Sequence, residues 1–498
     1  MAPHVANDIP PHLSMWQRVR EYAVPPSMIE TATARRAVDD WAGACAAARI
    51  DVDLDLRAVR DRHGTEFGTR LRADLRRLAP DLLRWHMPRI APDGRLRPGL
   101  TLSLAQYGGH DTGPVRLVVR TPPAWADAGQ RMSLALWEGP GDGAPGHHPH
   151  PHPERRFRLD LHRHLWDAAR SGELAWRSGA VGTPADPPPA PQGHSEQPAG
   201  LLDPPWAVAN WAAEAELLLR AEGRPRGAFT VRLGARSRVV LELTAPDDSH
   251  APTLRALRDT LPPQEVAALP VLPEAAARLL PDLELLRAGL VTAGRLHPLV
   301  AGALTAAGPV SAAGSACAAA DTASVLRRVP EHRDPHRVEC RGEIHRIALR
   351  NGVLTAVDHN PAELRREELL VALGGPALPC LRAIDAVHRN PEALPAVRER
   401  LRHGDVAGAL AVVEGLLGPD AVLRDGPLRE ELESAAARRI DHGLFRSGLV
   451  AVHPAAGTAG SASAAGRTEG HRPRLDRRVP AAMLSKRGGR SRPRTGLR

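Results

Sequence analysis

Cysteine, histidine and aspartate side chains gather in one stretch of this 498-residue chain, between positions 340 and 380. Cys340 and His345 open the stretch, Asp358 and His359 lie in its middle, and Cys380 closes it. Thiolates, imidazoles and carboxylates are the ligands that zinc takes from proteins, and a carboxylate that orients an imidazole can serve a metal site or a general base. These residue types therefore indicate a metal- or thiol-dependent site as one interpretation.

The strands expected around these residues decide which side chains meet. Asn351-Gly352 between two apolar runs is typical of a two-residue turn, and the resulting register places His345 opposite Asp358. Cys340 stands five residues before His345, an odd separation that sends the two side chains to opposite faces of a regular strand unless a bulge forms near Gly342. We therefore expect a structural His–Asp pair, with His345 and Asp358 as metal ligands in the alternative.

A second group of histidines lies further towards the N-terminus. A proline-rich loop carries histidines at 147, 148, 150 and 152, and Asp160, His162 and His164 follow at two-residue steps. Residues two apart share a face of a strand, so Asp160, His162 and His164 could hold one metal ion together. The alternative is that they face solvent beside a stiff loop, where they capture nickel or zinc only adventitiously.

No motif for catalysis or for a cofactor is complete. Residues 141–146 match the glycine pattern of a dinucleotide-binding turn, but the His-Pro repeats that follow cannot open the helix that receives the pyrophosphate. His332-Arg-Asp resembles a kinase catalytic loop, but Glu339 stands where an asparagine is needed. The sole lysine, Lys486, belongs to no phosphate-binding loop. We therefore predict no catalytic residue, no cofactor-binding residue and no cofactor.

The net charge of +9 belongs to the C-terminal end of the chain. From Arg467 onward there are eleven basic residues and two acidic ones, whereas the rest of the chain carries 55 of each sign. A basic tail without aromatic residues indicates weak, salt-dependent nucleic-acid binding through phosphates as an alternative function. We expect this tail to be disordered on its own.

The pattern of apolar residues predicts an α+β fold, in which a helical N-terminal segment carries an antiparallel sheet and a C-terminal β-hairpin and helical module follows. Alternate aspartates at 51–55 are expected to cap a helix. Four short alternating runs, bounded by Gly, Pro or Asp, indicate strands at 99–104, 114–120, 131–137 and 155–161, and a hairpin at 229–243 is expected to complete their sheet. Later helices are expected at 361–373, 378–387, 395–401, 405–417 and 427–444.

Composition divides the chain into seven segments. All nine tryptophans precede residue 212, so we expect an aromatic and aliphatic core first and an Ala/Leu/Val core later. The predicted segments are a helical N-terminal segment 1–96, a sheet 97–178, a disordered linker 179–205, a segment 206–304 with a helix, the hairpin and further helices, a linker 305–336, the hairpin-plus-helix module 337–450 and the disordered basic tail 451–498.

The features that report on location favour the cytoplasm. Four widely spaced cysteines do not make a disulfide framework, which favours a reducing compartment. The N-terminus has no apolar core of a signal peptide. Residues 299–320 are uncharged, but they are mostly Ala, Gly and Ser, so we interpret them as linker and expect no association with a membrane.

Several strings in the chain resemble a family of uncharacterised actinobacterial proteins, and the likeness covers most of the chain up to about Leu449. They are Ser27-Met-Ile-Glu-Thr-Ala-Thr-Ala-Arg-Arg, Leu78-Ala-Pro-Asp-Leu-Leu-Arg-Trp-His, Arg120-Thr-Pro-Pro-Ala-Trp-Ala-Asp-Ala-Gly-Gln-Arg, Arg156-Phe-Arg-Leu-Asp-Leu-His-Arg-His-Leu-Trp, Cys340-Arg-Gly and Leu410-Ala-Val-Val-Glu-Gly-Leu-Leu-Gly-Pro-Asp-Ala-Val-Leu-Arg-Asp. The resemblance implies a gene near those of MoxR-type AAA+ ATPases, and hence an ATPase as partner. It implies no activity and no residue role.

A non-enzymatic component that binds a protein partner, such as an adaptor, is the function we expect. This expectation depends on the reactive-looking side chains being scattered by strand geometry, so that they do not converge on one cavity or ion. The alternatives are a metal- or thiol-dependent enzyme that uses the Cys340/His345/Asp358 region, and nucleic-acid binding through the basic tail.

Overall fold

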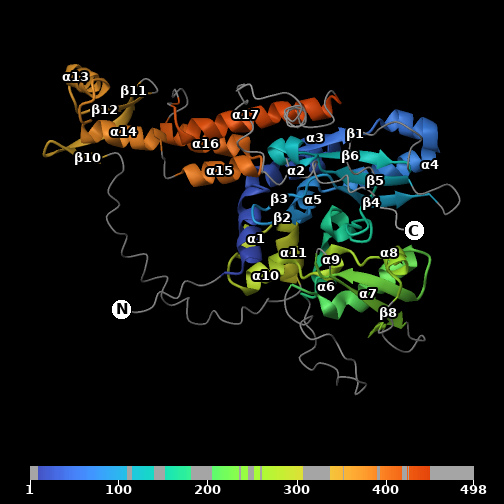
Figure 1. Cartoon of the computed structure of the whole chain (residues 1–498). Helices are drawn as coiled ribbons and strands as arrows, with labels where there is room; N and C mark the ends of the chain where they lie inside the picture. The colour runs from blue at the N-terminus through green and yellow to red at the C-terminus, as the bar shows by residue number, and fades with distance from the viewer. Residues whose placement is uncertain are drawn as a thin grey trace, which may run out of the picture. The chain divides into compact units, whose positions relative to one another are not determined.

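The structure is a computed structural model. It describes residues 9–108, 115–139, 152–180, 205–234, 237–244, 252–257, 261–306, 337–350, 353–389, 393–417, 423 and 425–448. The chain divides into two compact units, Met1–Thr121 with Arg131–Arg328 and Pro122–Gln130 with Val329–Arg498 (Figure 1). Almost all of the predicted linkers and the whole predicted tail lie outside the described residues. Separate sheets and helical regions confirm the α+β class.

Five helices open the first unit: α1 (Pro11–Tyr22), α2 (Pro26–Ala37), α3 (Trp41–Ala47), α4 (Leu56–Arg77) and α5 (Pro80–His86). Proline occupies the first position of α1, α2 and α5, where a helix has no use for the missing amide hydrogen. Asp40 caps α3 by accepting from the amide of Gly43, and Asp55 caps α4 by accepting from the amides of Arg57 and Ala58. The predicted capping role is therefore confirmed for Asp55.

The main sheet of the first unit has four strands in the order β1-β6-β5-β4. Three of them are expected strands, β4 (Thr101–Tyr107), β5 (Val115–Arg120) and β6 (Met132–Trp137), and they pair antiparallel. The fourth, β1 (Ile50–Asp53), pairs parallel to β6, which the alternate aspartates did not reveal.

The strand expected at 155–161 is wrong. The chain turns there, since the amide of Leu161 donates to the carbonyl of Arg158 and the amide of His162 to that of Leu159. The indole Nε1 of Trp166 also donates to the Leu159 carbonyl (2.9 Å). These bonds use backbone groups that a ladder would need, and only an isolated bridge to Ser103 remains.

The hairpin expected to complete the main sheet instead forms a separate sheet. It comprises β7 (Gly227–Arg232) and β8 (Arg238–Thr244), and β9 (Thr253–Ala256) pairs with β8 on the other side. The free edge of β7 is occupied by residues 270–272, because Thr230 exchanges backbone hydrogen bonds with Pro270 and Leu272. Both edges of the β7–β8 hairpin are thus paired. This sheet shares its own buried cluster with Trp211 and Leu218 of α7 (Trp211–Ala221).

Short elements complete the first unit: hairpin β2 (Arg89–Ile90) with β3 (Arg95–Leu96), 3-10 turns η3 (Arg163–Leu165), η4 (Ala168–Glu173), η5 (Val208–Asn210) and η6 (Ala293–Arg295), and helices α6 (Leu174–Arg177), α8 (Pro263–Ala268), α9 (Glu274–Ala277), α10 (Pro281–Arg287) and α11 (Pro298–Ala306). The larger core of this unit buries Trp85, Trp166 and Tyr107 among leucines. In the described part of the chain, no helix combines the length and the apolar character needed to cross a membrane.

The second unit contains one sheet, β10 (Arg337–Cys340), β11 (Glu343–Arg350) and β12 (Val353–Ala356), and the helices α13 (Pro361–Ala372), α14 (Pro379–Arg389), α15 (Leu394–Arg402), α16 (Val406–Leu417) and α17 (Pro427–Arg446). All five helices expected here are confirmed to within two residues at each end. The register expected for β11 and β12, with Leu349 opposite Leu354, is confirmed, although the turn residues Asn351 and Gly352 lie outside the described residues. The main core of this unit is aliphatic.

Residues 122–130, between β5 and β6 in the sequence, belong to the second unit. They form two 3-10 turns, η1 (Ala124–Ala126) and η2 (Ala128–Gln130). Nδ1 of His442 donates to the carbonyl of Ala126 (2.8 Å), and the ring of Trp125 packs edge-on against Phe445. Gly404 has φ of +82°, and a Cβ on it would stand 2.1 Å from the carbonyl oxygen of Gly129, so only glycine fits. The α15–α16 loop and α17 therefore hold this segment.

A second tight turn, for which we saw no signal in the sequence, joins β10 to β11. Arg341 (φ +58°) and Gly342 (φ +86°) form it, pairing Cys340 with Glu343 and Val338 with His345. Residues that are paired across two antiparallel strands lie on the same face of the sheet. Across a two-residue turn, paired residues are an odd number of positions apart, so Cys340 and His345, five positions apart, lie on the same face. They share this face because the chain is not a regular strand here: in place of the bulge considered near Gly342 it forms a turn.

We expect Gly342→Ala to lower the free energy of unfolding by about 1 kcal/mol, because an L side chain at this positive φ is strained. Gly415→Ala in the exposed face of α16 is the matched control, and it should stabilise by about 0.5–1 kcal/mol because alanine is the better helix former. Urea unfolding, with hydrogen exchange of peptides from 337–350, measures both. If Gly342→Ala stabilised the protein, the positive φ assigned to Gly342 in this turn would be contradicted.

Candidate functional site

Three side chains in the second unit converge on one point. Sγ of Cys340, Sγ of Cys380 and a ring nitrogen of His359 all lie within 4.8 Å of one another. Tetrahedral zinc with Zn–S of about 2.3 Å and Zn–N of about 2.0 Å holds such atoms roughly 3.5–3.8 Å apart, so a closure of about 1 Å suffices. Among the described residues, this is the one group of three or more His, Cys, Asp or Glu side chains with metal-binding spacing.

Each ligand comes from the end of a regular element. Cys340 ends β10, His359 follows β12 after a turn onto the carbonyl of Ala356, and Cys380 is the second residue of α14. Both cysteines are fully buried, and together with Ala356 and Leu378 they make up a small apolar cluster. The expectation that the reactive residues do not converge is therefore wrong for these three.

His345 lies beside this group, and Asp358 does not join it. The ring of His345 stacks on that of His359 with centroids 4.0 Å apart and planes 14° apart, and its buried Nδ1 has no hydrogen-bond partner. Asp358 accepts instead from the amide (2.7 Å) and the guanidinium (3.1 Å) of Arg346. The predicted His345–Asp358 pair is not formed, because the β11–β12 ladder ends at the Ile347–Ala356 pair and the chain turns there, with the amide of His359 donating to the carbonyl of Ala356.

Burial sets the charge of the site. It raises the pKa of the Cys380 thiol to about 12, with a further contribution from Cys340, which shares a hydrogen bond with it. Burial and then the neighbouring His345 lower the pKa of His359, which favours the neutral imidazole. Neutral imidazole is the form that binds metal, and the two thiols would lose their protons to a bound cation.

The other predicted metal ligands occupy a different environment in the first unit. His162 and His164 are buried, with ring centroids 5.8 Å apart, and both line a cavity of about 310 Å³. Asp160 is bound by the guanidinium of Arg158, at 2.8–3.0 Å. Nε2 of His162 lies 3.1 Å from a carboxylate oxygen of Glu214. The trio does not form a metal site, because the strand that would align it is absent.

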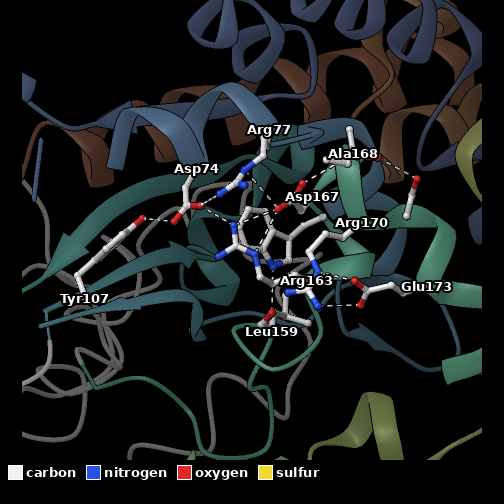
Figure 2. A network of polar contacts seen from close by, with 12 residues as sticks. Asp74, Arg77, Tyr107, Leu159, Arg163, Asp167, Ala168, Arg170 and Glu173 are labelled. Carbon is white, nitrogen blue, oxygen red and sulfur yellow. Dashed lines mark hydrogen bonds and ion pairs between the residues drawn. The ribbon is translucent and has the colours of Figure 1, made fainter. Parts of the chain in front are cut away.

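A polar network around Arg163 holds the segment that carries the two histidines, and Figure 2 shows this network. Arg163, which lies between them in the sequence, donates to the carboxylates of Asp74 and Asp167, and its guanidinium covers the ring of Trp166 at 4.6 Å. Asp74 also accepts from the hydroxyl of Tyr107 (2.7 Å) and from Arg77 (2.6 Å). The segment carrying the histidines is thus tied to α4 and β4.

Residues that sequence reasoning missed also line the cavity. His86 at the end of α5 and Arg97 after β3 both reach it, together with Arg20 of α1. Their positions carry no motif, and they come together only through contacts between elements far apart in the chain. Cys380 and His359 differ, because their residue types alone pointed to a site.

Comparison with protein-family models, with curated proteins and with solved structures found no match. The resemblance to an actinobacterial family therefore stays a prediction. Function has to be inferred from the geometry of the two sites alone.

We expect Asp74→Asn to lower the free energy of unfolding by about 2–3 kcal/mol, because it removes the charge of a buried carboxylate that accepts hydrogen bonds from Arg163, Tyr107 and Arg77. Glu173→Gln, which breaks the more exposed pair with Arg170, is the matched control and should cost under about 1 kcal/mol. Urea unfolding followed by tryptophan fluorescence compares them. Equal small losses would show that the network adds no more than a surface ion pair.

The effect of Asp74 should also depend on pH. Burial alone would raise its pKa, but hydrogen bonds from Arg163 and Tyr107 outweigh burial and hold the pKa below its usual value. A carboxylate with a depressed pKa in the folded state contributes stability above its unfolded pKa, about 3.9, and loses it as the pH falls through the folded-state pKa. The difference in unfolding free energy between the wild type and Asp74→Asn should therefore shrink from about pH 5 to about pH 2.

Proposed function

We propose that the second unit binds one zinc ion through Cys340, His359 and Cys380. The single observation that supports this is the convergence of three good zinc ligands from three different elements within 4.8 Å. The position of Cys380 in the first turn of α14 adds to it, because the positive end of a helix favours a thiolate.

His345 is the fourth ligand in this proposal. Its ring is parallel to that of His359, and the lone pairs of an imidazole lie in the ring plane, so the stacked ring must turn before it can point at the same ion. Its Nδ1 is buried without a partner, which a bond to zinc would satisfy. Four ligands close the coordination shell, which is typical of structural rather than catalytic zinc.

The small cluster around the two thiols favours a structural role. Only Cys340, Ala356, Leu378 and Cys380 are buried in it, so the contact between the β10–β11–β12 sheet and α14 has little apolar area next to the thiols, whereas Ile347, Leu354 and Ile384 of the same elements pack in the main core. A bound ion adds its binding free energy to folding. Zinc would therefore fasten the sheet to the helix.

The interaction role expected from the sequence has lost its premise that the reactive side chains do not converge, and with an AAA+ ATPase as partner it stays an untested prediction. Helix α13 favours it, because it has no buried residue and leaves Leu369, Leu370 and Val371 exposed, with Leu373 beside them. Nothing in the described residues indicates what would cover this helix. The basic tail lies outside the described residues, so nucleic-acid binding also stays a prediction.

We expect full-length protein without a histidine tag to hold about one zinc ion per chain, by analogy with closed structural sites. Cys340→Ala, His359→Ala and Cys380→Ala should each remove it, whereas His345→Ala should weaken zinc binding roughly tenfold or more and leave a three-ligand site. Elemental analysis and competition with a chromogenic chelator measure these outcomes. Hydrogen exchange in 337–358 should rise when zinc is removed.

Cys45→Ala provides a matched control. Cys45 is also fully buried, and burial raises its pKa to about 12, but it lies in the first unit. This variant should keep its zinc. Wild-type protein without metal would overturn the proposal, and a peptide map that joins Cys340 to Cys380, with a mass lower by two hydrogens before reduction, would assign the pair to a disulfide instead.

A further inference from the structure

The cavity of the first unit, about 310 Å³ in volume, is large enough for a small organic molecule. Its wall combines residues of α1, the end of α5, the 157–165 segment, α6 and the α9–α10 region. Apolar side chains supply much of this wall, among them Met15, Trp16, Met87, Phe157, Leu159 and Leu174. Such a surface accommodates an apolar body.

Most charged groups in the wall are already paired. Arg20 is matched by Asp282, Arg158 by Asp160, and Arg177 by Glu214. These pairs are buried and hydrogen-bonded to each other, so they form the frame of the cavity and offer no charge to a ligand.

The region of the wall around Glu274 differs, because positive charge exceeds negative charge there. The Glu274 carboxylate accepts from Arg156 (2.7 Å) and lies 3.7 Å from Arg278. Arg97 is attracted by this carboxylate and repelled by the guanidinium groups of Arg156, Arg232 and Arg278. One carboxylate thus faces several guanidinium groups, of which Arg97 and Arg278 line the cavity.

Two guanidinium groups of the wall have no carboxylate of their own among the described residues: Arg89, which donates to the backbone carbonyls of Arg84 and Gly94, and Arg97. The half-buried side chain of Arg97 makes no ion pair within 4 Å among the described residues, and its buried Nε has no hydrogen-bond partner. The buried Nε of Arg97 has therefore lost its hydration without compensation. The carboxylate of a ligand would supply two parallel hydrogen bonds and the missing charge.

Two imidazoles in the same wall also lack partners. His164 is 5% exposed and its Nδ1 has no hydrogen bond, and Nε2 of His86 has none either. Burial, followed by nearby positive groups, lowers the pKa of both well below the usual range, so both rings are neutral. Neutral imidazoles can bind a polar substituent without adding charge.

We propose that this cavity binds a small organic carboxylate, with the acid group at Arg97 and the apolar body against the surrounding hydrophobic side chains. A single negative charge fits better than a phosphate dianion, because Arg97 offers one guanidinium while Glu214, Glu274 and Glu284 also line the wall and repel anions. The site is independent of the proposed zinc site, since all of its residues belong to the first unit.

Three ring compounds of nearly equal shape test the charge requirement: benzoate (anionic), benzamide (neutral) and benzamidine (cationic). Titration calorimetry of the full-length chain should show benzoate binding roughly tenfold or more tighter than benzamide, and no binding of benzamidine. Arg97→Gln should remove the preference for benzoate. Arg57→Gln, which changes an exposed arginine of α4 in the same unit, should leave it unchanged.

Stability without ligand separates a binding role of Arg97 from a structural one. Removing an unpaired, half-buried cation should leave the thermal midpoint of Arg97→Gln equal to or above that of the wild type. A lower midpoint together with lost binding would assign Arg97 a structural role and overturn the proposal. Equal affinity for benzoate and benzamide, or no benzoate binding at millimolar concentrations, would overturn it as well.

Discussion

The first unit depends on the hydrogen bonds that the carboxylate of Asp282 accepts. This carboxylate accepts two hydrogen bonds from the guanidinium of Arg20 (2.9 and 2.7 Å) and one from the indole of Trp85 (3.1 Å), and it is shielded from water. These residues come from α10, α1 and α5, so one carboxylate joins both ends of the unit's sequence. Removing one partner of such a buried pair lowers the free energy of unfolding by about 3–5 kcal/mol, because the other partner is left as a buried charge without compensation. Since Arg20 also lines the cavity, the same constraint determines the position of one wall.

Matched and unmatched charges therefore have different consequences in this protein. Where a guanidinium meets its own carboxylate, as for Arg163 with Asp74 and Asp167, the result is a fixed segment of backbone. Where it does not, as for Arg97, the fold retains a charge that a ligand can use. The Cys380 thiol of the second unit presents the same contrast in another form, because burial raises its pKa and keeps it neutral until a cation compensates for its ionisation.

The elements whose formation is determined by residues close together in the sequence could be predicted. Those that form through contacts between residues far apart in the sequence could not. Helices α13 to α17 and the β11–β12 register followed from proline, glycine and apolar spacing over short stretches. Strand β1 was missed, since it pairs in parallel with a strand about eighty residues later and carries only a four-residue signal. For the metal site, the residue types were recognised, but the Arg341-Gly342 turn was overlooked, and that turn reverses which faces Cys340 and His345 share. For the cavity, only His162 and His164 were recognised in the sequence, and as metal ligands; Arg20, His86 and Arg97 were not, because they come from elements that only tertiary packing unites.

The placement of residues 122–130 in the second unit makes that unit discontinuous in the sequence. During synthesis these residues leave the ribosome before α15 and α17 have been made. The ring contact of Trp125 with Phe445 and the hydrogen bond from His442 to the carbonyl of Ala126 can therefore form only after α17 has been synthesised. The second unit therefore cannot finish folding co-translationally ahead of the chain's C-terminal helices, and a fragment beginning at Val329 lacks a piece of its own interior. Cutting the polypeptide at the apparent boundary would separate pieces that belong to one folding unit.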